Sequence, residues 1–553
     1  MRGLAPDSHP WQGVMYEGSP VEVWEQVTYA ECEARVIALA RGLLGRGLGP
    51  NRPVMILSGN SLEHALLALA AMHVGIPVAP VSPAYSLMSR DFHKLRWISK
   101  LIQPGLVFAD DAARFAGAVQ VVLEECAASG VPEPLVLDRL DSLPAHVDAE
   151  VDAEQVREAA AAVGPDTVAK ILFTSGSTGT PKGVINTQRM MCANQQAIAQ
   201  CWPFLARRPP LLVDWLPWNH TFGGNHNFNM VLAHGGTLVI DRGKPAPGLV
   251  EHTVENLRVH APTMYFNVPR GFDMLLPYLE SDSGLAEQFF SQLDLVFYAG
   301  AALPQSLWTR LDALAQRILG HSVMMSSAWG ATETAPLVTS VHFPIPRAGV
   351  IGLPAPGCEL YMVPHRGKYE MRVKAPWVTP GYFRQPQLTA AAFDARGAYL
   401  IGDAGRLADP NKPACGVVFD GRVAEDFKLT SGTWVHVGVV RVEVIAALSP
   451  VCQDIVVAGE SRDELAVLVV PNLGNCQKLV GSPGATLAEL RVHEKVLAAI
   501  AEGLSRHNQA NPQGSRRIAR AVMVATPPQI DAGEVTDKGY LNQRAILERR
   551  ADV

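Results

Sequence analysis

The sequence has no surplus of either charge. It carries 47 basic and 53 acidic side chains in 553 residues, a net charge of −6. Proteins that bind nucleic acid or anionic membranes usually show a clear positive surplus, so neither is expected as a partner. Charged residues make up 18% of the chain and apolar residues 48%. This balance excludes a disordered chain and predicts a large globular core.

A long unbroken apolar run is also missing. The longest, residues 65–81, is interrupted by His73, Gly75, Pro77 and Pro80 and is too short to cross a bilayer. The first residues contain no apolar segment typical of a secretory signal. We therefore expect a cytoplasmic protein without a membrane partner.

Cysteine is scarce. The eight cysteines are scattered, with no C-x-x-C pair and no zinc-ligand spacing. In a long chain this pattern favours reduced, mostly buried thiols over disulfides or a structural zinc site. His220 and His226 form no H-E-x-x-H pattern, and His226 is expected to pack in the core or in a pocket wall.

The chain contains a regular alternation of helix and strand patterns. Residues 29–48 are amphipathic behind Thr28, a candidate N-cap, and residues 61–73 predict a second helix. Residues 54–57 and 78–81 are short apolar strands. Further strands are expected at residues 211–216, 237–241, 293–298 and 323–327. This alternation predicts parallel sheets covered by helices.

The pattern of predicted elements changes near residue 420, where a turn-rich region ends. Residues 455–458 and 465–470 flank a polar turn and predict a β-hairpin. Thr486 and Glu489 form a capping box that predicts a helix reaching about Ser505. We predict an α/β protein with a large N-terminal body of helix-covered sheets and a small, mobile α+β C-terminal lid. The expected boundaries are residues 1–420 for the body, 421–426 for the hinge and 427–553 for the lid.

The most informative segment is residues 174–183, which read TSGSTGTPKG. Five hydroxyl residues, three glycines and Lys182 follow an apolar strand at residues 171–173. Their backbone N–H groups, hydroxyls and single cation suit a polyphosphate. The segment is not a Walker A loop, because Pro181 stands where that motif needs glycine. The alternative is a flexible linker or an ordinary turn.

Two further acids fit a nucleotide site. Thr332 and Glu333 lie in a loop after a predicted strand, where a carboxylate can hold Mg²⁺ beside phosphates. Asp403 lies in a predicted tight turn and is suited to accept hydrogen bonds from a ribose diol. Each acid alone is a weak signal, because most acids in turns are simply solvated. Together with the loop at residues 174–183, they indicate a nucleotide site.

With these motifs in this order, the chain resembles the adenylate-forming superfamily of acyl-CoA synthetases, peptide-synthetase adenylation domains and luciferases. The resemblance runs from about Tyr29 to Glu548 and implies ATP, Mg²⁺ and coenzyme A as cofactors and a small-molecule carboxylic acid as substrate. It implies catalytic roles for Lys538, Thr332, Glu333 and His220, with Glu333 as the metal ligand. The nucleotide- and CoA-binding positions that it implies are Thr174, Ser175, Gly176, Ser177, Thr178, Gly179, Lys182, Gly300, Ala301, Ala302, Trp329, Gly330, Thr332, Asp403, Arg422 and Gly432.

The hinge segment departs from the family pattern. Residues 421–432 are one residue longer than the usual Gly-Arg-x-x-Asp-x-Ile-Lys-x-x-Gly. Counting forward from Arg422 puts the hinge at Ala424, and counting back from Gly432 puts it at Glu425. Both assignments stay open.

Three segments narrow the resemblance. Residues 186–191, 425–434 and 538–544 are similar to those of feruloyl-CoA synthetases, which activate hydroxycinnamates from lignin-derived phenolics. Ferulate is therefore the expected acid, in a ligase that forms acyl-AMP, releases pyrophosphate and then AMP, and yields the CoA thioester. By the same resemblance, the acyl pocket is lined by His220, Gly300, Ala328, Pro336 and Leu337.

Other interpretations remain open. Another aromatic or medium-chain acid would leave the chemistry unchanged, and an adenylating enzyme can also pass its acyl-AMP to a carrier protein or oxidise it. A non-catalytic nucleotide-binding paralogue is the alternative from a different class. Trp202, Trp215 and Trp218 are expected to pack in the core rather than to stack on a substrate. The sequence does not fix the oligomeric state and leaves a homodimer open.

Overall fold

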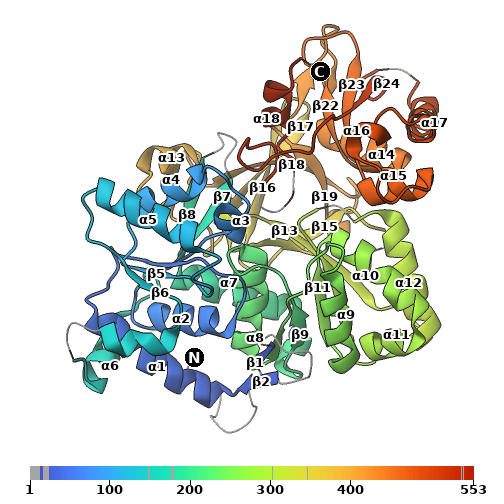
Figure 1. Ribbon diagram of the computed structural model, residues 1–553. Coiled ribbons are helices and arrows are strands. Elements are labelled where there is room, and N and C mark those ends of the chain that lie inside the picture. The colour runs from blue at the N-terminus through green and yellow to red at the C-terminus, as the bar shows by residue number, and fades with distance from the viewer. Residues whose placement is uncertain are drawn as a thin grey trace.

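The structure is a computed structural model and describes residues 13–16, 24–146, 150–175, 180–301, 303–345, 347–512, 514–536, 539 and 541–552. Figure 1 shows a large body, coloured blue through yellow, with a smaller C-terminal unit in orange and red standing above one side of it. The predicted α/β fold with a large body and a smaller C-terminal domain is confirmed.

The first large sheet has six strands and carries the phosphate-loop candidate. Its strands lie in the order β6–β5–β3–β4–β7–β8 and are parallel except for the last pair, which is antiparallel. Their bounds are β3 (Val54–Ile56), β4 (Val78–Pro80), β5 (Leu106–Phe108), β6 (Leu135–Leu137), β7 (Val168–Ser175) and β8 (Pro181–Thr187). The neighbouring helices are α1 (Tyr29–Gly45), α2 (Leu62–His73), α3 (Pro83–Leu87), α4 (His93–Ile102), α5 (Ala116–Ala128), α6 (Ala153–Ala162) and α7 (Gln188–Cys201).

Helix α1 begins as predicted and ends early. Thr28 and Glu31 form a capping box at its start. The helix ends at Gly45 rather than at residue 48 as predicted. The Arg46 N–H bonds the carbonyl of Gly42, and Gly47 then adopts a left-handed conformation with φ of 68°. A glycine in that conformation stops an α-helix without steric cost.

The second large sheet has nine strands and carries the candidate acids. Their order is β11–β12–β13–β14–β15–β19–β18–β17–β16, with the first three parallel and the others antiparallel. The bounds are β11 (Met264–Asn267), β12 (Leu295–Tyr298), β13 (Met324–Gly330), β14 (Leu337–Ser340), β15 (Val350–Pro354), β16 (Glu359–His365), β17 (Lys368–Lys374), β18 (Tyr399–Leu407) and β19 (Val417–Arg422). The helices that follow or join its strands are α9 (Val250–Val259), α10 (Pro269–Ser281), α11 (Ser283–Phe290), α12 (Gln305–Leu319) and α13 (Pro386–Ala391).

Asp403 lies in strand β18, so the predicted tight turn is wrong. The register between β18 and β19 shifts between Asp403 and Gly405, and Gly402 has a φ of 80°. Such a bulge re-aims a side chain while the strand continues, which explains how a turn-like glycine–acid pair fits inside a ladder.

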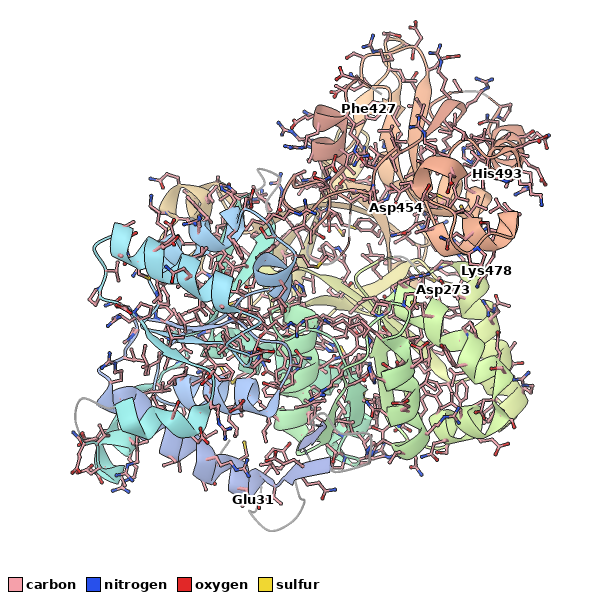
Figure 2. The ribbon with its side chains drawn as sticks, viewed as in Figure 1. Glu31, Asp273, Phe427, Asp454, Lys478 and His493 are labelled. Atoms are coloured by element: carbon pink, nitrogen blue, oxygen red, sulfur yellow. The ribbon has the colours of Figure 1, made fainter. Side chains whose placement is uncertain are left out.

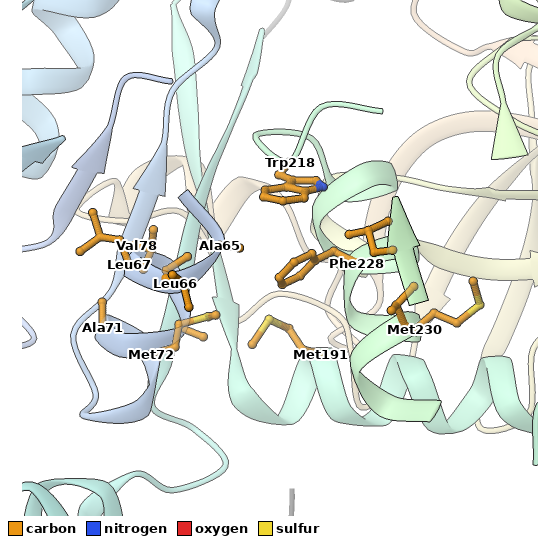
Figure 3. Close-up of a cluster of buried hydrophobic side chains, with 14 of the residues drawn as sticks. Ala65, Leu66, Leu67, Ala71, Met72, Val78, Met191, Trp218, Phe228 and Met230 are labelled. Carbon is orange, nitrogen blue, oxygen red and sulfur yellow. The ribbon is translucent and has the colours of Figure 1, made fainter. Parts of the chain in front are cut away.

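A third sheet, in the order β2–β1–β10–β9, completes the body. Its strands are β1 (Gly13–Tyr16), β2 (Trp24–Val27), β9 (Leu211–Asp214) and β10 (Thr237–Ile240), and a π-helix (Phe222–Asn227) and α8 (Phe228–His234) lie between the last two. Figure 3 shows how the core packs here: the rings of Trp218 and Phe228 pack against each other above Met191, with 4.7 Å between their centroids and a tilt of 51° between their planes.

The predicted packing of the tryptophans and cysteines is largely confirmed. Trp202 and Trp218 are buried in the core, whereas Trp215 is half-buried. All eight cysteines are free, and those that are buried are Cys32, Cys126, Cys201, Cys452 and Cys476. Within the described ranges, no helix combines the length and apolarity needed to cross a bilayer.

The C-terminal unit is α+β. Its strands are β20 (Phe427–Lys428), β21 (Trp434–Val435), β22 (Cys452–Ala458), β23 (Leu465–Pro471) and β24 (Ile518–Met523). Its helices are α14 (Val437–Leu448), α15 (Leu473–Val480), α16 (Leu487–Leu490), α17 (Glu494–Ala510) and α18 (Gln543–Arg549). The predicted hairpin is confirmed as β22 and β23. Figure 2 places Asp454, Lys478 and His493 within this unit.

The predicted helix from Thr486 to Ser505 is two helices. The capping box of Thr486 and Glu489 is present, but α16 ends at Leu490. His493 then accepts a hydrogen bond from the Lys495 N–H and begins α17 as a second N-cap. Side chains that cap a backbone N–H compete with a continuous helix, and here the second cap prevails.

Candidate active site

The segment proposed to bind phosphate begins and ends in two paired strands. Strands β7 and β8 pair antiparallel, with Thr174 opposite Lys182 and Ser175 opposite Pro181. The predicted phosphate-binding residues between these strands in the sequence, Gly176, Ser177, Thr178 and Gly179, lie outside the described residues. The hairpin therefore fixes both ends of the loop and brings Thr174 and Lys182 side by side.

Residues 379–385 cross the hairpin at strand β8. The Phe383 N–H donates to the Gly183 carbonyl at 2.7 Å, and the Ile185 N–H donates to the Gly381 carbonyl at 3.1 Å. Gly381 has a φ of 147°, and a Cβ there would lie 2.3 Å from the Thr389 side chain, so the crossing needs glycine. These contacts fix the position of the next residue, Tyr382.

Tyr382 connects the phosphate hairpin to Glu333. The Lys182 Nζ atom lies 5.1 Å from the centroid of the Tyr382 ring, and the Tyr382 hydroxyl donates to Glu333 Oε1 at 3.0 Å. Burial, reinforced by the negative charge of Glu333, raises the pKa of Tyr382, so the phenol keeps its proton and remains a donor. The sequence reasoning missed Tyr382, because a tyrosine after a Pro-Gly pair carries no signal of its own.

Glu333 is held in a tight turn directly after strand β13. It lies in the 3-10 helix (Thr332–Thr334), and its own carbonyl accepts a hydrogen bond from the Thr379 N–H at 2.8 Å. A Cβ on Gly330 would lie 1.6 Å from the Pro336 carbonyl oxygen, so the turn has room only for glycine. The predicted loop after a strand is confirmed, and Thr332 and Glu333 are both buried.

A second cluster surrounds Asp403. The Trp329 Nε1 atom donates to Asp403 Oδ2 at 2.9 Å, and Arg422 Nε lies 3.6 Å from Asp403 Oδ1. Burial raises the pKa of Asp403, and Arg422 opposes that rise. The Arg422 side chain is 68% exposed and Asp403 only 13%. A desolvated carboxylate with one weak ion pair gains from further donors such as hydroxyl groups.

Of the residues predicted to line the acid pocket, Gly300 follows β12, Ala328 lies in β13, and Pro336 and Leu337 lie at the start of β14, whereas His220 belongs to a separate segment after β9. Gly300 is exposed in a left-handed conformation, and Ala328 is half-buried. Pro336 is half-buried, whereas the Leu337 side chain is packed in the core. His220 is half-buried before the π-helix. Of the other two positions predicted with Gly300, Ala301 is exposed and Ala302 lies outside the described residues.

The π-helix after His220 is held from below by a buried lysine that the sequence reasoning missed. Lys170 Nζ donates to the Gly224 carbonyl at 2.9 Å and to Asn225 Oδ1 at 3.3 Å. Gln195 Nε2 donates to the Asn225 carbonyl at 2.8 Å. Burial lowers the pKa of Lys170 to about 8. The sequence signal that could have found Lys170 is a lysine inside an otherwise apolar strand. The π-helix that it supports is itself of interest, because π-helical turns often occur at functional sites.

Gly432, predicted to bind CoA, makes none of the contacts described above around Glu333 and Asp403. It lies in the exposed turn between β20 and β21, with a φ of 79° and its N–H bonded to the Leu429 carbonyl. Lys538 lies outside the described residues. Residues upstream of it reach the body: the Lys94 Nζ atom donates to the Ile530 carbonyl at 3.1 Å. The same helix, α4, donates from Trp97 Nε1 to the Pro181 carbonyl at 3.0 Å.

The donor set around Glu333 fits Mg²⁺ only in company with phosphates. Among the described side chains, no three His, Cys, Asp or Glu residues gather as a metal site. Mg²⁺ is commonly held by one or two carboxylates together with substrate phosphates and waters. Glu333, with one oxygen engaged by Tyr382, suits that arrangement.

The sequence is similar to those of known enzymes. The family described as "AMP-binding enzyme" matches residues 10–383. The long-chain-fatty-acid–CoA ligase FadD15 of Mycobacterium bovis is 24% identical over 97% of this chain and 93% of that protein. The 3-[(3aS,4S,7aS)-7a-methyl-1,5-dioxo-octahydro-1H-inden-4-yl]propanoyl:CoA ligase of Rhodococcus jostii is 27% identical over 84% of this chain and 86% of that protein.

The fold matches solved structures over nearly its whole length. The ATP-bound structure of MatB from Rhodopseudomonas palustris superposes with a TM-score of 0.70 at 23% identity, covering 96% of this chain and 94% of that chain.

Proposed function

The chain belongs to the AMP-binding enzyme family, and on that premise we propose that it is an ATP-dependent acid–CoA ligase that works through an acyl-AMP intermediate. The observation that carries the proposal is the connection from Lys182 through Tyr382 to Glu333, which joins the phosphate hairpin to the acidic turn. A non-catalytic paralogue would have no need to keep a buried carboxylate aligned with the hairpin lysine.

Each part of ATP has a matching group in the proposal. The β7–β8 hairpin tip and Lys182 bind the phosphates, and Asp403 and Arg422 bind the ribose diol. Trp329 positions Asp403 through its Nε1 hydrogen bond, and the turn at Gly300 receives the adenine. Bound beside Glu333, Mg²⁺ would supply electrostatic stabilisation of the phosphate oxygens.

The first half-reaction joins the acid to AMP. A carboxylate oxygen of the acid attacks the α-phosphorus of ATP, and the bond from that phosphorus to the bridging oxygen breaks to release pyrophosphate. Lys182 stabilises the negative charge that develops on the phosphates, and Lys538 from the lid stabilises the new carboxylate–phosphate junction. The contacts of Lys94 in α4 with Ile530, and of Arg90 just before α4 with Asp531, support this role for Lys538, because α4 also contacts the phosphate hairpin.

The second half-reaction transfers the acyl group to CoA. The thiolate sulfur attacks the acyl carbonyl carbon, and the carbon–oxygen bond to AMP breaks. We propose that the lid turns about Ala424 or Glu425 so that the Gly432 turn reaches the thiol tunnel. Two curated relatives named as CoA ligases align over most of their length, which supports CoA as the acceptor.

For the acid we propose a hydroxycinnamate, with ferulate first. Gly300, Gly330 and Ala328 lack bulk at the ends of β12 and β13, and this supports a flat slot in which a conjugated ring can lie. His220 would line the carboxylate end of that slot. A long-chain fatty acid is the second candidate, because a relative with that name aligns over 97% of the chain.

The test is acid-dependent exchange of pyrophosphate into ATP without CoA, with ferulate, p-coumarate, benzoate, octanoate and palmitate. The proposal expects ferulate and p-coumarate to give the highest kcat/KM. A tenfold or larger preference for octanoate or palmitate, about 1.4 kcal/mol of transition-state free energy, would overturn the hydroxycinnamate assignment and leave the ligase assignment intact.

A further inference from the structure

His226 sits among aromatic rings with one nitrogen unpartnered. Its side chain is 1% exposed, and its ring lies 5.3 to 5.9 Å, centroid to centroid, from four aromatic neighbours. Those neighbours are Trp202, Phe222, Phe266 and Phe297, and we call them with His226 the aromatic cage. No described residue hydrogen-bonds His226 Nε2. Buried polar atoms normally have partners, so an orphan of this kind calls for an explanation.

The other ring nitrogen identifies the tautomer. Asn227 Nδ2 donates to Asp214 Oδ2 at 3.0 Å, so the Asn227 amide oxygen faces His226. That oxygen lies 2.9 Å from His226 Nδ1, which must therefore carry the hydrogen. Burial lowers the pKa of His226 to about 4, so the ring is neutral near pH 7. With the hydrogen on Nδ1, the orphan Nε2 is an acceptor that needs a donor.

The main chain around His226 is rigidly supported. The π-helix that carries it is fixed by Lys170 at Gly224 and Asn225, and Gln195 Nε2 lies 3.2 Å from the His226 carbonyl oxygen. Asn225 Nδ2 also donates to Asn186 Oδ1 at 2.8 Å. A main chain held by so many buried polar contacts keeps His226 pre-organised for recognition.

Along the strands, the aromatic cage lies before the small residues of the proposed acid slot, further from the carboxyl ends of the strands. Phe266, Phe297 and Ser326 pair in one row across β11, β12 and β13. Ala299 and Ala328 follow two residues beyond Phe297 and Ser326 on the same face, at about 6.6 Å along the strands. Both alanines are half-buried, and both pack against the cluster that contains the cage phenylalanines.

The proposed slot therefore has an end near the ATP site and an end near the aromatic cage. Gly300, Gly330 and the Glu333 turn lie beyond the alanines at the carboxyl ends of the strands, where the acid would meet ATP. The aromatic cage lies at the opposite end, and Phe222 is its one half-buried member. An aromatic ring lying over Ala299 and Ala328 would direct its far substituent toward His226.

We propose that His226 is a specificity-determining residue whose Nε2 accepts a hydrogen bond from a phenolic hydroxyl at the end of the acid remote from its carboxylate. The inference rests on the proposed function and deepens it, because it restricts the substrate class to hydroxy-substituted aromatic acids. A substrate without that hydroxyl leaves the buried acceptor unpaired, which a site built for hydrogen bonding penalises strongly.

The test compares three acids that differ only at the ring position para to the side chain: 4-hydroxycinnamate, cinnamate and 4-methoxycinnamate. The unmodified enzyme should favour 4-hydroxycinnamate at least tenfold in kcat/KM over both others, because neither of them can donate. The His226→Phe and His226→Leu variants should bring these ratios below about threefold. Either variant suffices if the other fails to fold, and equilibrium binding of the three acids to the unmodified enzyme repeats the comparison without any variant.

A matched control is His234→Phe. His234 is the last residue of α8, and its Nε2 atom also has no described partner, yet it lies outside the aromatic cage. This variant should keep the tenfold preference. Equal use of the three acids by the unmodified enzyme, or a tenfold preference that survives in His226→Phe, would overturn the assignment of His226. Absence of pyrophosphate exchange with every acid would instead refute the proposed function.

Discussion

Lys368 and Asp426 form a buried ion pair between the nine-stranded sheet and the segment that leads into the C-terminal unit. The Lys368 Nζ atom lies 2.6 Å from Asp426 Oδ2, and the two side chains are 4% and 7% exposed. Lys368 belongs to β17 of the nine-stranded sheet, whereas Asp426 immediately precedes β20. His436 Nδ1 lies 3.0 Å from the same carboxylate oxygen. The predicted hinge at Ala424 or Glu425 is thus followed directly by an anchor to the body.

Removing the lysine should destabilise the protein strongly. We expect Lys368→Met to lower the free energy of unfolding by about 3–5 kcal/mol, because Asp426 would stay buried without its main counter-charge. Urea unfolding followed by tryptophan fluorescence measures the change. The control is Arg544→Met, which removes an exposed pair with Glu548 and should leave the stability nearly unchanged. A loss below about 1 kcal/mol in Lys368→Met would contradict the anchoring role.

Lys538→Ala should separate the two half-reactions. The variant should lose acyl-AMP formation but largely keep the conversion of supplied acyl-AMP and CoA to thioester, because the proposed lid would present its lysine to the phosphates in one orientation only. Rapid-quench measurement of each half-reaction provides the readout. Equal loss of both would show that the lid does not work in two orientations.

Gly432→Leu should block thioester formation and spare adenylation. A Cβ at Gly432 meets no atom within 4 Å, so bulk is tolerated in the orientation described here, and the harm is expected when the turn enters the thiol tunnel. Because the φ of 79° strains any side chain, Gly432→Ala is the matched control: it carries the same strain with little bulk. Thioester formation by Gly432→Leu at the rate of the alanine variant would place the tunnel elsewhere.

Lys170 should make stability depend on pH above neutrality. Burial lowers its pKa from 10.5 to about 8, so between these values the unfolded chain binds a proton that the folded protein has lost. Stability relative to Lys170→Met should therefore rise by up to about 3 kcal/mol from pH 8 to pH 10.5 and stay constant below pH 8. Nearby His64 is neutral over this range, because burial lowers its pKa to about 4.

Urea unfolding of both proteins at pH 7, 9 and 10 tests this expectation. A stability difference that does not change with pH would mean that Lys170 keeps its proton in the folded protein.

Local patterns predicted much of the body. The N-cap at Thr28, the apolar strands and the β22–β23 hairpin depend on residues close in sequence, and sequence reasoning found them. The helix break before His493 was missed because two competing caps lie within one amphipathic stretch. Local propensity cannot decide which cap prevails when packing contributes to both.

The connecting residues of the site could not be predicted in this way. Tyr382 meets Glu333 across 49 positions, and Lys170 meets Asn225 across 55. Such pairs depend on which strands become neighbours, and hydrophobic periodicity does not encode that order. The motifs therefore supplied candidate acids and a candidate loop, whereas the residue that joins them emerged only from the fold.

The most direct test of the account follows one turnover with ATP labelled at the α-phosphate. With an active acid and no CoA, the protein should accumulate acyl-AMP up to the enzyme concentration and release an equal amount of pyrophosphate. Adding CoA should convert that acyl-AMP to thioester and release one AMP per thioester. Formation of ADP in place of AMP, or acyl-AMP that CoA fails to discharge, would contradict an acid–CoA ligase that works through an acyl adenylate.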